Sequence, residues 1–588
     1  MGAAHTEDYR DSMPVKTKPA SFGAWALCGI WALILTFTFP ANAQDFRPEL
    51  PASALPDTRL KQLPDVTEPK PPPEIAVPEA APSRAPAGAE KIQFVLTGLD
   101  IEGATVYSQA DLEQLYSEFL GKEVTLAQVY DIAAEIQRMY RRDGYFLTRV
   151  ILPPQTASEG KLRVVVIEGY INDFKIQGDI GPVEEKVSLY LAHVLDERPL
   201  KLQTLERFLL LVRDIPGVNV DGILKPAPDT PGAAHLVATV DRKRFDGFGL
   251  VDNIGTTFTG NWEIAAGAMS NSFTRLGEQA SITGLLSDPH KGTGSNEKNQ
   301  WVGQLSFSLR PGSHGQYVEF LGSYGDSNPG DIISQFDFES KELLLSATGG
   351  YPIIRSRQLN LSTELGFDYI DSDTDIFNNV KFSRDRLRVL HLSGTTDVRD
   401  RWRGANVASL GIRQGLPILD ASDSNDDFLS RPNGSGTFTS LQASASRLQA
   451  ITGPYTAFLS VAGQYAFSDL LSDEEFGVGG VRFGRGYDAK ELSNDDGVGL
   501  TGELQFTRPS KLWPLESYQL FAFYDFGAVW DHSSRQSDSL SSGGGGVRVW
   551  AAHDTSVALQ LAKPLTRDSQ RADGDRDVQL LFRALTRF

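Results

Sequence analysis

The chain has 588 residues and carries 56 Lys and Arg against 75 Asp and Glu, which gives a formal net charge of −19. This balance argues against a nucleic-acid partner, because affinity for phosphates needs clustered basic side chains, and the sequence has no basic stripe. The single cysteine, Cys28, lies in an apolar run near the N-terminus. We therefore expect a mature protein without disulfides or thiolate chemistry.

Residues 1–43 are predicted to be a secretory signal peptide. An apolar run at 22–39 follows two lysines and precedes Ala41-Asn42-Ala43, so we expect cleavage after Ala43. A transmembrane anchor is the alternative, since the run is close to the roughly 18 residues at which spanning becomes possible. No basic stop-transfer cluster follows the run, which favours removal. Translation starts at Met1 or Met13 on this interpretation.

Residues 44–91 are predicted to be a linker because they are crowded with proline and alanine. Each proline removes a backbone donor and disfavours helix before it, so we expect an extended and largely solvated spacer.

Two small α+β domains follow, at residues 92–168 and 169–243. In the first, the pattern predicts strand, helix, helix, strand, strand, with capping boxes that begin the helices at Ser108 and Thr125. The second repeats this order after about 75 residues, which indicates two copies of one domain. The apolar helix faces are most simply core. Alternatively, an exposed strand edge and its neighbouring groove take an extended peptide by strand addition.

Residues 244–588 read as repeated alternating strands without convincing helices. A soluble β-sandwich would give the same alternation, but long strands, alternating short turns and long polar loops, and aromatic strand ends favour an outer-membrane barrel of about sixteen antiparallel strands. The last strand places Phe582 and Phe588 on its lipid-facing side, and we expect them to form a C-terminal barrel signature.

One loop and two strands suggest a charge pair inside this barrel. The loop carries Arg485 and continues as Gly486 and Tyr487, while Asp525 is the only charge in the apolar and aromatic stretch 520–530. Alternation turns Asp525 away from the lipid face, so it needs a cationic partner in the lumen. We expect Arg485 to be that partner and Glu503 to be a weaker second contact. We predict that Arg485, Gly486, Tyr487, Asp525 and Glu503 form a latch in the barrel lumen that exists in one state and loosens in another. A purely structural pair, with Glu503 as one more hydrated lumen charge, is the alternative.

With these features the chain resembles the TpsB-type two-partner secretion transporters, the ShlB/FhaC/HecB family within the BamA superfamily. The family motif Val-Arg-Gly-Tyr, in the loop between strands eleven and twelve, stands here as residues 484–487, with Gly484 in place of Val. The family's F-x-D-x-G stretch on strand thirteen is matched by Phe523, Asp525 and Gly527. Gly484 predicts a more flexible loop tip. Prolines in 45–63 argue against the plug helix that some relatives place in the barrel.

The resemblance implies an outer-membrane transporter with two periplasmic POTRA-like domains that recognise the secretion signal of a large partner exoprotein, such as a haemolysin, haemagglutinin or adhesin. Outer-membrane lipid and the barrel-assembly machinery are the further partners implied. We see no P-loop, HExxH, GxSxG or His/Cys cluster, so we expect no enzymatic activity, no cofactor and no metal. An insertase of the same superfamily and a porin-type channel remain the alternatives.

Overall fold

The computed structural model describes residues 50–55, 75–76, 84–156, 159–288, 299–377, 379–572 and 574–588. The predicted signal peptide and its cleavage site lie outside the described residues. Residues Pro51–Phe588 form one compact unit.

The first α+β unit contains the two predicted helices, and both begin as expected. Ser108 and Thr125 each accept a hydrogen bond from the backbone N–H three residues on, and the side chain at that position bonds back, so both capping boxes are confirmed. The first helix is shorter than predicted, because a 3₁₀ turn at Ser117–Phe119 follows it. The elements are β2 Gln93–Val95, β3 Gly98–Glu102, α1 Gln109–Glu113, β4 Glu123–Thr125, α2 Leu126–Arg142, β5 Arg149–Ile151 and β6 Lys161–Ile167.

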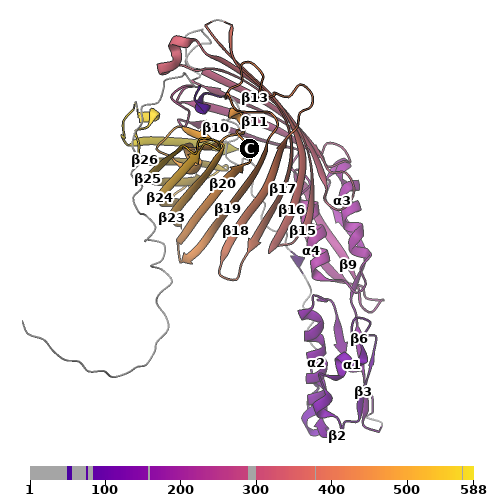
Figure 1. Cartoon of the computed structure of the whole chain (residues 1–588). Helices are drawn as coiled ribbons and strands as arrows, with labels where there is room; N and C mark the ends of the chain where they lie inside the picture. Colours follow the sequence, from indigo (N-terminus) through magenta and orange to yellow (C-terminus); the bar gives the residue numbers. More distant parts are fainter. Residues whose placement is uncertain are drawn as a thin grey trace, which may run out of the picture. The chain divides into compact units, whose positions relative to one another are not determined.

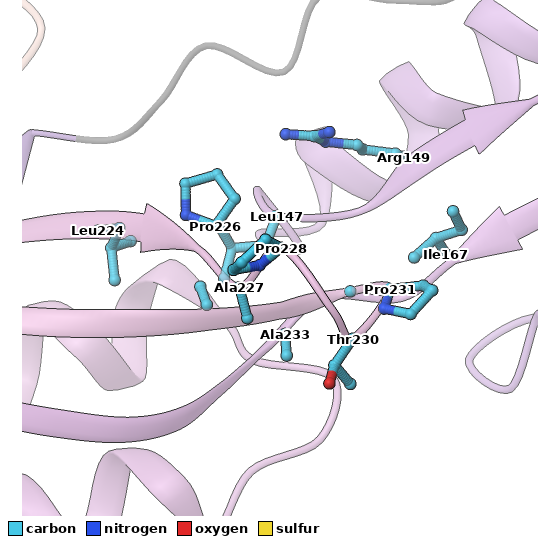
Figure 2. A pocket seen from close by; sticks show the side chains of 12 residues that line it. Leu147, Arg149, Ile167, Leu224, Pro226, Ala227, Pro228, Thr230, Pro231 and Ala233 are labelled. Carbon is cyan, nitrogen blue, oxygen red and sulfur yellow. The ribbon is translucent and has the colours of Figure 1, made fainter.

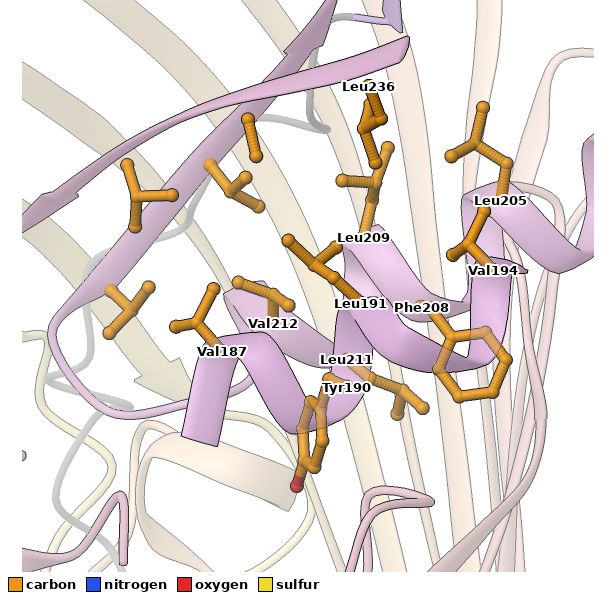
Figure 3. Packing of buried hydrophobic residues seen from close by; sticks show 14 of the residues in the cluster. Val187, Tyr190, Leu191, Val194, Leu205, Phe208, Leu209, Leu211, Val212 and Leu236 are labelled. Carbon is orange, nitrogen blue, oxygen red and sulfur yellow. The ribbon is translucent and has the colours of Figure 1, made fainter. Parts of the chain in front are cut away.

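The second α+β unit repeats the order strand, helix, helix, strand, strand of the first, in which β2 and β4 form an additional two-stranded sheet. It consists of β7 Tyr170–Gln177, α3 Glu184–Ala192, α4 Leu202–Arg213, β8 Val218–Pro226 and β9 Ala233–Arg242. Apolar side chains recur at helical spacing on α3 and α4 and point toward one another and toward Leu236 of β9 (Figure 3). Tyr190 and Leu209 are completely buried there, so the helices are held to the sheet by a continuous apolar core.

The remainder of the chain forms a closed barrel of sixteen strands, which confirms the predicted fold class (Figure 1). The strands are β10 Phe245–Asp252, β11 Glu263–Asn271, β12 Gln279–Ser287, β13 Asn299–Leu309, β14 Tyr317–Asn328, β15 Glu339–Arg355, β16 Leu359–Ile376, β17 Val380–Arg399, β18 Gly404–Gly415, β19 Thr439–Thr452, β20 Tyr455–Ala466, β23 Asp496–Pro509, β24 Leu515–Trp530, β25 Ser537–Ala551, β26 Thr555–Pro564 and β27 Gln579–Arg587. Neighbours pair antiparallel, and β10 closes on β27 from Phe248 opposite Arg587 to Asp252 opposite Arg583.

The barrel strands separate apolar and polar side chains onto opposite faces. On β23 the side chain of Leu504 is 55% exposed on the outer face, whereas Glu503 and Gln505 beside it are buried inside. On β24, Tyr524 is exposed outside while Asp525 is fully buried within. Period-two alternation therefore gives an apolar outer wall and a polar lumen. No helix in the described part of the chain is long and apolar enough to cross a membrane.

Two short pieces of the predicted linker bond to the folded part of the chain. Ile75–Ala76 forms strand β1, which pairs in parallel with β8 at Gly222 and Ile223. Ala52–Ala54 forms a buried 3₁₀ turn against the barrel, where the carbonyls of Ser53 and Ala54 accept hydrogen bonds from the hydroxyls of Thr256 (3.1 Å) and Ser327 (2.9 Å). Proline prevents a long helix here but leaves backbone carbonyls free to bond, which the sequence reading did not anticipate.

The second α+β unit contacts several turns at the adjoining end of the barrel. Lys186 Nζ donates to the carbonyls of Arg310 (2.8 Å) and Gly312 (3.0 Å). Arg355 makes a bidentate pair with Asp214 through Nε at 2.8 Å and Nη2 at 2.7 Å. These charge-assisted bonds attach α3 and α4 to the turns after β13 and β15.

Candidate functional site

The loop between β20 and β23 folds into the barrel. It contains β21 Phe476–Val478, the short helical turn α5 Gly480–Phe483 and β22 Leu492–Asn494, and β21 pairs with β22 to form a hairpin. The tip, residues 483–489, is buried throughout. By chain order β20 and β23 are the eleventh and twelfth barrel strands and β24 is the thirteenth, so the loop and the Asp525 strand occupy the positions that the family pattern predicted.

Arg485 lies against Asp525. Its Nε donates to Asp525 Oδ2 at 2.9 Å, its Nη2 donates to Oδ1 at 2.8 Å, and its backbone N–H donates to Oδ2 at 3.0 Å. The guanidinium carbon also lies 3.6 Å from the ring centre of Phe523 on the same strand. The pair therefore combines a bidentate fork with a cation–π contact, the geometry that a buried ion pair needs to offset its desolvation.

Asp525 has further partners in the barrel wall. Thr501 Oγ1 lies 2.9 Å from Oδ1 and 2.6 Å from the carbonyl of Arg482, so its one proton can be donated to either, and Ser542 Oγ donates to Oδ2 at 3.3 Å. Both residues sit directly opposite Asp525 on the neighbouring strands β23 and β25. The wall thus forms a polar pocket around the carboxylate, with the loop arginine supplying the positive charge.

Glu503 is shared by two arginines. Arg485 Nη1 lies 2.5 Å from Glu503 Oε1, and Arg548 of β25 donates to both carboxylate oxygens at 2.9 and 3.0 Å. Arg548 also lies 3.8 Å above the ring of Phe521. The sequence reading missed Arg548. The sequence could have revealed it, because Arg548 is the one charged residue in the apolar end of β25. By alternation with its apolar neighbours, its side chain faces the lumen.

The glycines that flank Arg485 are required by close packing. Gly484 has φ of 146°, and a Cβ there would lie 2.7 Å from Leu540 Cδ1. At Gly486 a Cβ would lie 2.8 Å from the backbone nitrogen of Pro564. Gly in place of Val therefore does not leave a loose tip in this structure. It lets the backbone adopt a left-handed conformation and approach the wall.

Tyr487 completes the tip by bonding to backbone on two neighbouring elements. Its hydroxyl lies 3.1 Å from the carbonyl of Ser541 and 3.2 Å from that of Arg567, and it can donate to either. The ring packs with Val478, Val529 and Leu540 in a small apolar cluster. The structure thus brings together Arg485, Gly486, Tyr487, Glu503 and Asp525. Their role as a latch stays a prediction.

A second charged cluster anchors the base of the loop. Arg431, from the connection between β18 and β19, pairs with Asp495 and with Asp531 at 2.9 Å. Asp469, Asp495 and Asp531 each offer an oxygen within 4.8 Å of the others, a spacing that a metal ion could use. The guanidinium of Arg431 already supplies positive charge to two of the three carboxylates, so the cluster is a structural network rather than a candidate metal centre.

The two predicted C-terminal residues lie apart from the latch. Phe588 is exposed, and its backbone exchanges two hydrogen bonds with Gly247 at 2.9 and 3.0 Å, which extends the closure between β27 and β10. The ring of Phe582 lies 6.1 Å from that of Trp262. Their role as a barrel signature stays a prediction.

Family profiles match the first α+β unit and most of the barrel. The profile described as POTRA domain, ShlB-type, matches residues 94–169, and the profile described as haemolysin secretion/activation protein ShlB/FhaC/HecB matches residues 234–549. The second match covers more than half of the chain. The chain belongs to the ShlB/FhaC/HecB family.

Curated relatives and solved structures agree with this assignment. The chain is 24% identical over 475 residues to the heme/hemopexin transporter protein HuxB of Haemophilus influenzae, covering 79% of this chain and 82% of the relative. It is 22% identical over 506 residues to the outer membrane transporter CdiB of Dickeya dadantii, covering 82% and 86%. CdiB structures from Escherichia coli (TM-score 0.71, 18% identity, 87% and 94% covered) and Acinetobacter baumannii (TM-score 0.63, 16% identity, 90% and 97% covered) share its fold.

The family assignment gives the barrel its orientation. Members of this two-partner secretion family are outer-membrane transporters of a partner protein, with their POTRA domains in the periplasm. Because β10 follows directly on the second α+β unit, the end of the barrel that carries the short turns, such as 400–403, is periplasmic. The loop that carries Arg485 enters the lumen from the extracellular end.

Proposed function

We propose that this protein exports a large exoprotein of the haemolysin, haemagglutinin or adhesin type through its barrel, and that the two α+β units receive the exoprotein's secretion signal. The observation that carries the proposal is the loop folded into the lumen, whose arginine is bound by two carboxylates of the wall. A loop that only needed a fixed position could pack on apolar side chains. A loop that is bound through charged side chains can replace these contacts with contacts to water or to another chain when it moves.

The edge of β8 is the candidate site for the secretion signal. This edge already accepts an extended backbone, since β1 pairs with it in parallel. Next to the paired residues, a cavity of about 190 Å³ opens between the connection of β8 to β9 and the first unit (Figure 2). Its lining includes Pro226, Pro228 and Pro231 from the second unit and Leu147 and Arg149 from the first. An extended peptide would add its backbone to β8 and place a side chain in the cavity.

The exported chain would then pass through the lumen while the loop changes position. We infer that folding of the exoprotein outside the cell drives this passage, because neither a nucleotide nor a proton gradient is available in the periplasm and the sequence has no P-loop motif. The Arg485 cluster would hold the loop in the resting state, and the barrel-assembly machinery would insert the barrel itself.

A secretion assay tests the proposal. The candidate exoprotein is sought as an open reading frame beside this gene that encodes a long protein with an N-terminal secretion domain. It is expressed in a strain that lacks the transporter, with and without the mature chain. We expect exoprotein in the medium only when the transporter is present. If the exoprotein stays in the periplasm while the levels of other outer-membrane barrels depend on this protein, the insertase alternative replaces the export proposal.

A further inference from the structure

The periplasmic turns of the barrel fall into two groups. Some are covered by the second α+β unit: Arg242 Nη1 donates to the carbonyl of Ser272 at 2.7 Å, Lys186 bonds the turn after β13, and Arg357 lies 3.5 Å from Glu206. The turn at 400–403, between β17 and β18, makes none of these contacts. It is the turn at which exposed cations gather.

Residues 401–403 read Arg-Trp-Arg, and all three side chains are exposed. Neither Arg401 nor Arg403 forms an ion pair within the described ranges, while the one carboxylate of the turn, Asp400, is already bound. Asp400 Oδ2 lies 2.6 Å from Arg447 Nη1, and Oδ1 accepts the backbone N–H groups of Trp402 and Gly404 at 2.9 Å. The turn therefore presents two uncompensated guanidinium groups in a chain whose net charge is −19.

The wall next to this turn changes from apolar to polar on its outer face. Arg413 points inward, where it binds Glu474 of the lumenal loop at 2.7 Å, so the even-numbered residues of β18 face outward. Successive outward pairs toward the turn are Ile412 with Leu441, Leu410 with Ala443, Ala408 with Ala445, Asn406 with Arg447 and Gly404 with Gln449. On β18 and β19 the apolar belt thus ends two outward residue pairs before the turn, close to the depth where phospholipid headgroups lie.

Trp402 places the turn at that depth. Its side chain is 64% exposed, and the guanidinium carbon of Arg401 lies 5.0 Å from its ring centre. An exposed indole flanked by cations is suited to the membrane interface, because the ring enters the acyl boundary while the cations stay among the headgroups.

We propose that Arg401, Trp402 and Arg403 bind an anionic phospholipid of the periplasmic leaflet through its phosphodiester group. Guanidinium forks match phosphate oxygens in geometry and charge. In a chain whose net charge is −19, this turn concentrates positive charge at the membrane interface. Phosphatidylglycerol is the probe that fits this chemistry, and zwitterionic phosphatidylcholine is the neutral comparison.

The turn at 510–514 offers a matched control. Trp513 is 85% exposed there, so this turn also enters the interface, but Lys511 is its only cation. It should anchor the barrel in the membrane without preferring anionic lipid.

The test uses the full mature chain in liposomes, with spin-labelled phosphatidylglycerol or phosphatidylcholine reporting which lipid lies next to the protein. We expect the wild type to prefer phosphatidylglycerol, and the preference to fall by about fivefold for each charge removed in R401Q, R403Q and the double variant. K511Q should keep the preference, and high salt should weaken it in the wild type. A wild type without preference, a double variant that keeps it, or an equal loss in K511Q would each overturn the proposal. Heat-modified mobility on a gel checks that every variant is folded.

Discussion

Asp525 shows why the lumenal cluster is sensitive to single substitutions. The carboxylate is fully buried, and Arg485 is its one cationic partner among the residues that the structure describes, because Arg548 bonds Glu503 instead. Glu503 keeps a cation when Arg485 leaves, whereas Asp525 keeps only neutral donors. The cluster is therefore asymmetric, and the loop position should depend most on the bond between Arg485 and Asp525.

Replacing Arg485 by Ala tests this bond. The change leaves a buried carboxylate without a cation, which commonly costs about 3–5 kcal/mol. We expect the barrel to reach the membrane at normal abundance while export of the exoprotein falls, and Arg485→Lys to retain an intermediate level because an ammonium cannot form the fork. Secretion is measured against barrel abundance on the same blot.

Arg482→Ala is the matched control, because Arg482 belongs to the same loop and directly precedes the tip, but is exposed. Normal export by Arg485→Ala at equal barrel abundance would contradict the latch role. An equal loss of export in Arg482→Ala would show that any substitution in or beside the loop tip reduces export, whichever contact it removes.

Gly484→Val restores the residue usual in the family and should destabilise the loop in this chain. A β-branched side chain at φ of 146° is strained, a left-handed backbone alone costs roughly 1–2 kcal/mol, and the new Cβ meets Leu540. We expect faster protease cleavage within 476–494 in intact outer membranes. Gly502 has open space around it, so the loop of the Gly502→Val variant should be cleaved by the protease at the wild-type rate. Wild-type resistance in Gly484→Val would contradict the packing argument.

Glu168 should make the first α+β unit sensitive to acid. Burial alone would raise the pKa of this carboxyl, but hydrogen bonds from Thr105, Tyr140 and Val106 outweigh burial and hold the pKa below its ordinary value. A carboxyl with a lowered pKa stabilises the folded state above its unfolded pKa, near 4.3. This stabilisation is lost as the pH falls through the folded value.

We therefore expect hydrogen-exchange protection of α2, corrected for intrinsic rates, to be lower at pH 3 than at pH 7. Glu168→Gln should lower the protection at pH 7 and flatten its pH dependence. Glu123→Gln, a change at an exposed carboxyl in the same unit, should do neither. A pH dependence that is unchanged in Glu168→Gln would contradict the assignment.

At the scale of elements, alternation and capping made most of the fold predictable. Period-two patterning gave the sixteen strands and the lumenal side of Asp525, and two capping boxes gave the starts of α1 and α2. Patterning could not reveal β1, because a two-residue strand depends on an edge supplied about 145 residues later in the chain. Arg548 and Arg431 were missed because their partners are not local in sequence: Glu503 lies two strands before Arg548, and the partners of Arg431, Asp495 and Asp531, lie in other connections.

Strand β1 yields a prediction of its own, which depends on the proposed function. If β1 occupies the edge that receives the secretion signal, weakening β1 should free that edge. Replacing both Ile75 and Ala76 by Pro removes the backbone donors of β1. We expect tighter binding of the exoprotein's N-terminal domain to the double variant, measured by titration in detergent. Ala87→Pro, which places a second proline directly after Pro86, provides the control outside β1. Unchanged or weaker binding in the double variant would place the signal elsewhere.

At the scale of the whole molecule, three features are connected along one chain. The periplasmic units offer a strand edge, the barrel encloses a polar lumen, and a loop held by charges lies within that lumen. A simple diffusion channel needs neither the strand edge nor a loop held in its lumen by charges. An exporter uses both, because the exported chain must be received in extended form and must then pass the loop.

Translocation into liposomes tests this account most directly. Purified mature protein is reconstituted in liposomes, the unfolded exoprotein is added outside, and protease then digests whatever has not entered. Barrels that insert with their α+β units outward should protect the exoprotein, empty liposomes should not, and barrels with Arg485→Ala should protect much less of it. Equal digestion with and without the wild-type barrel would contradict export through its lumen.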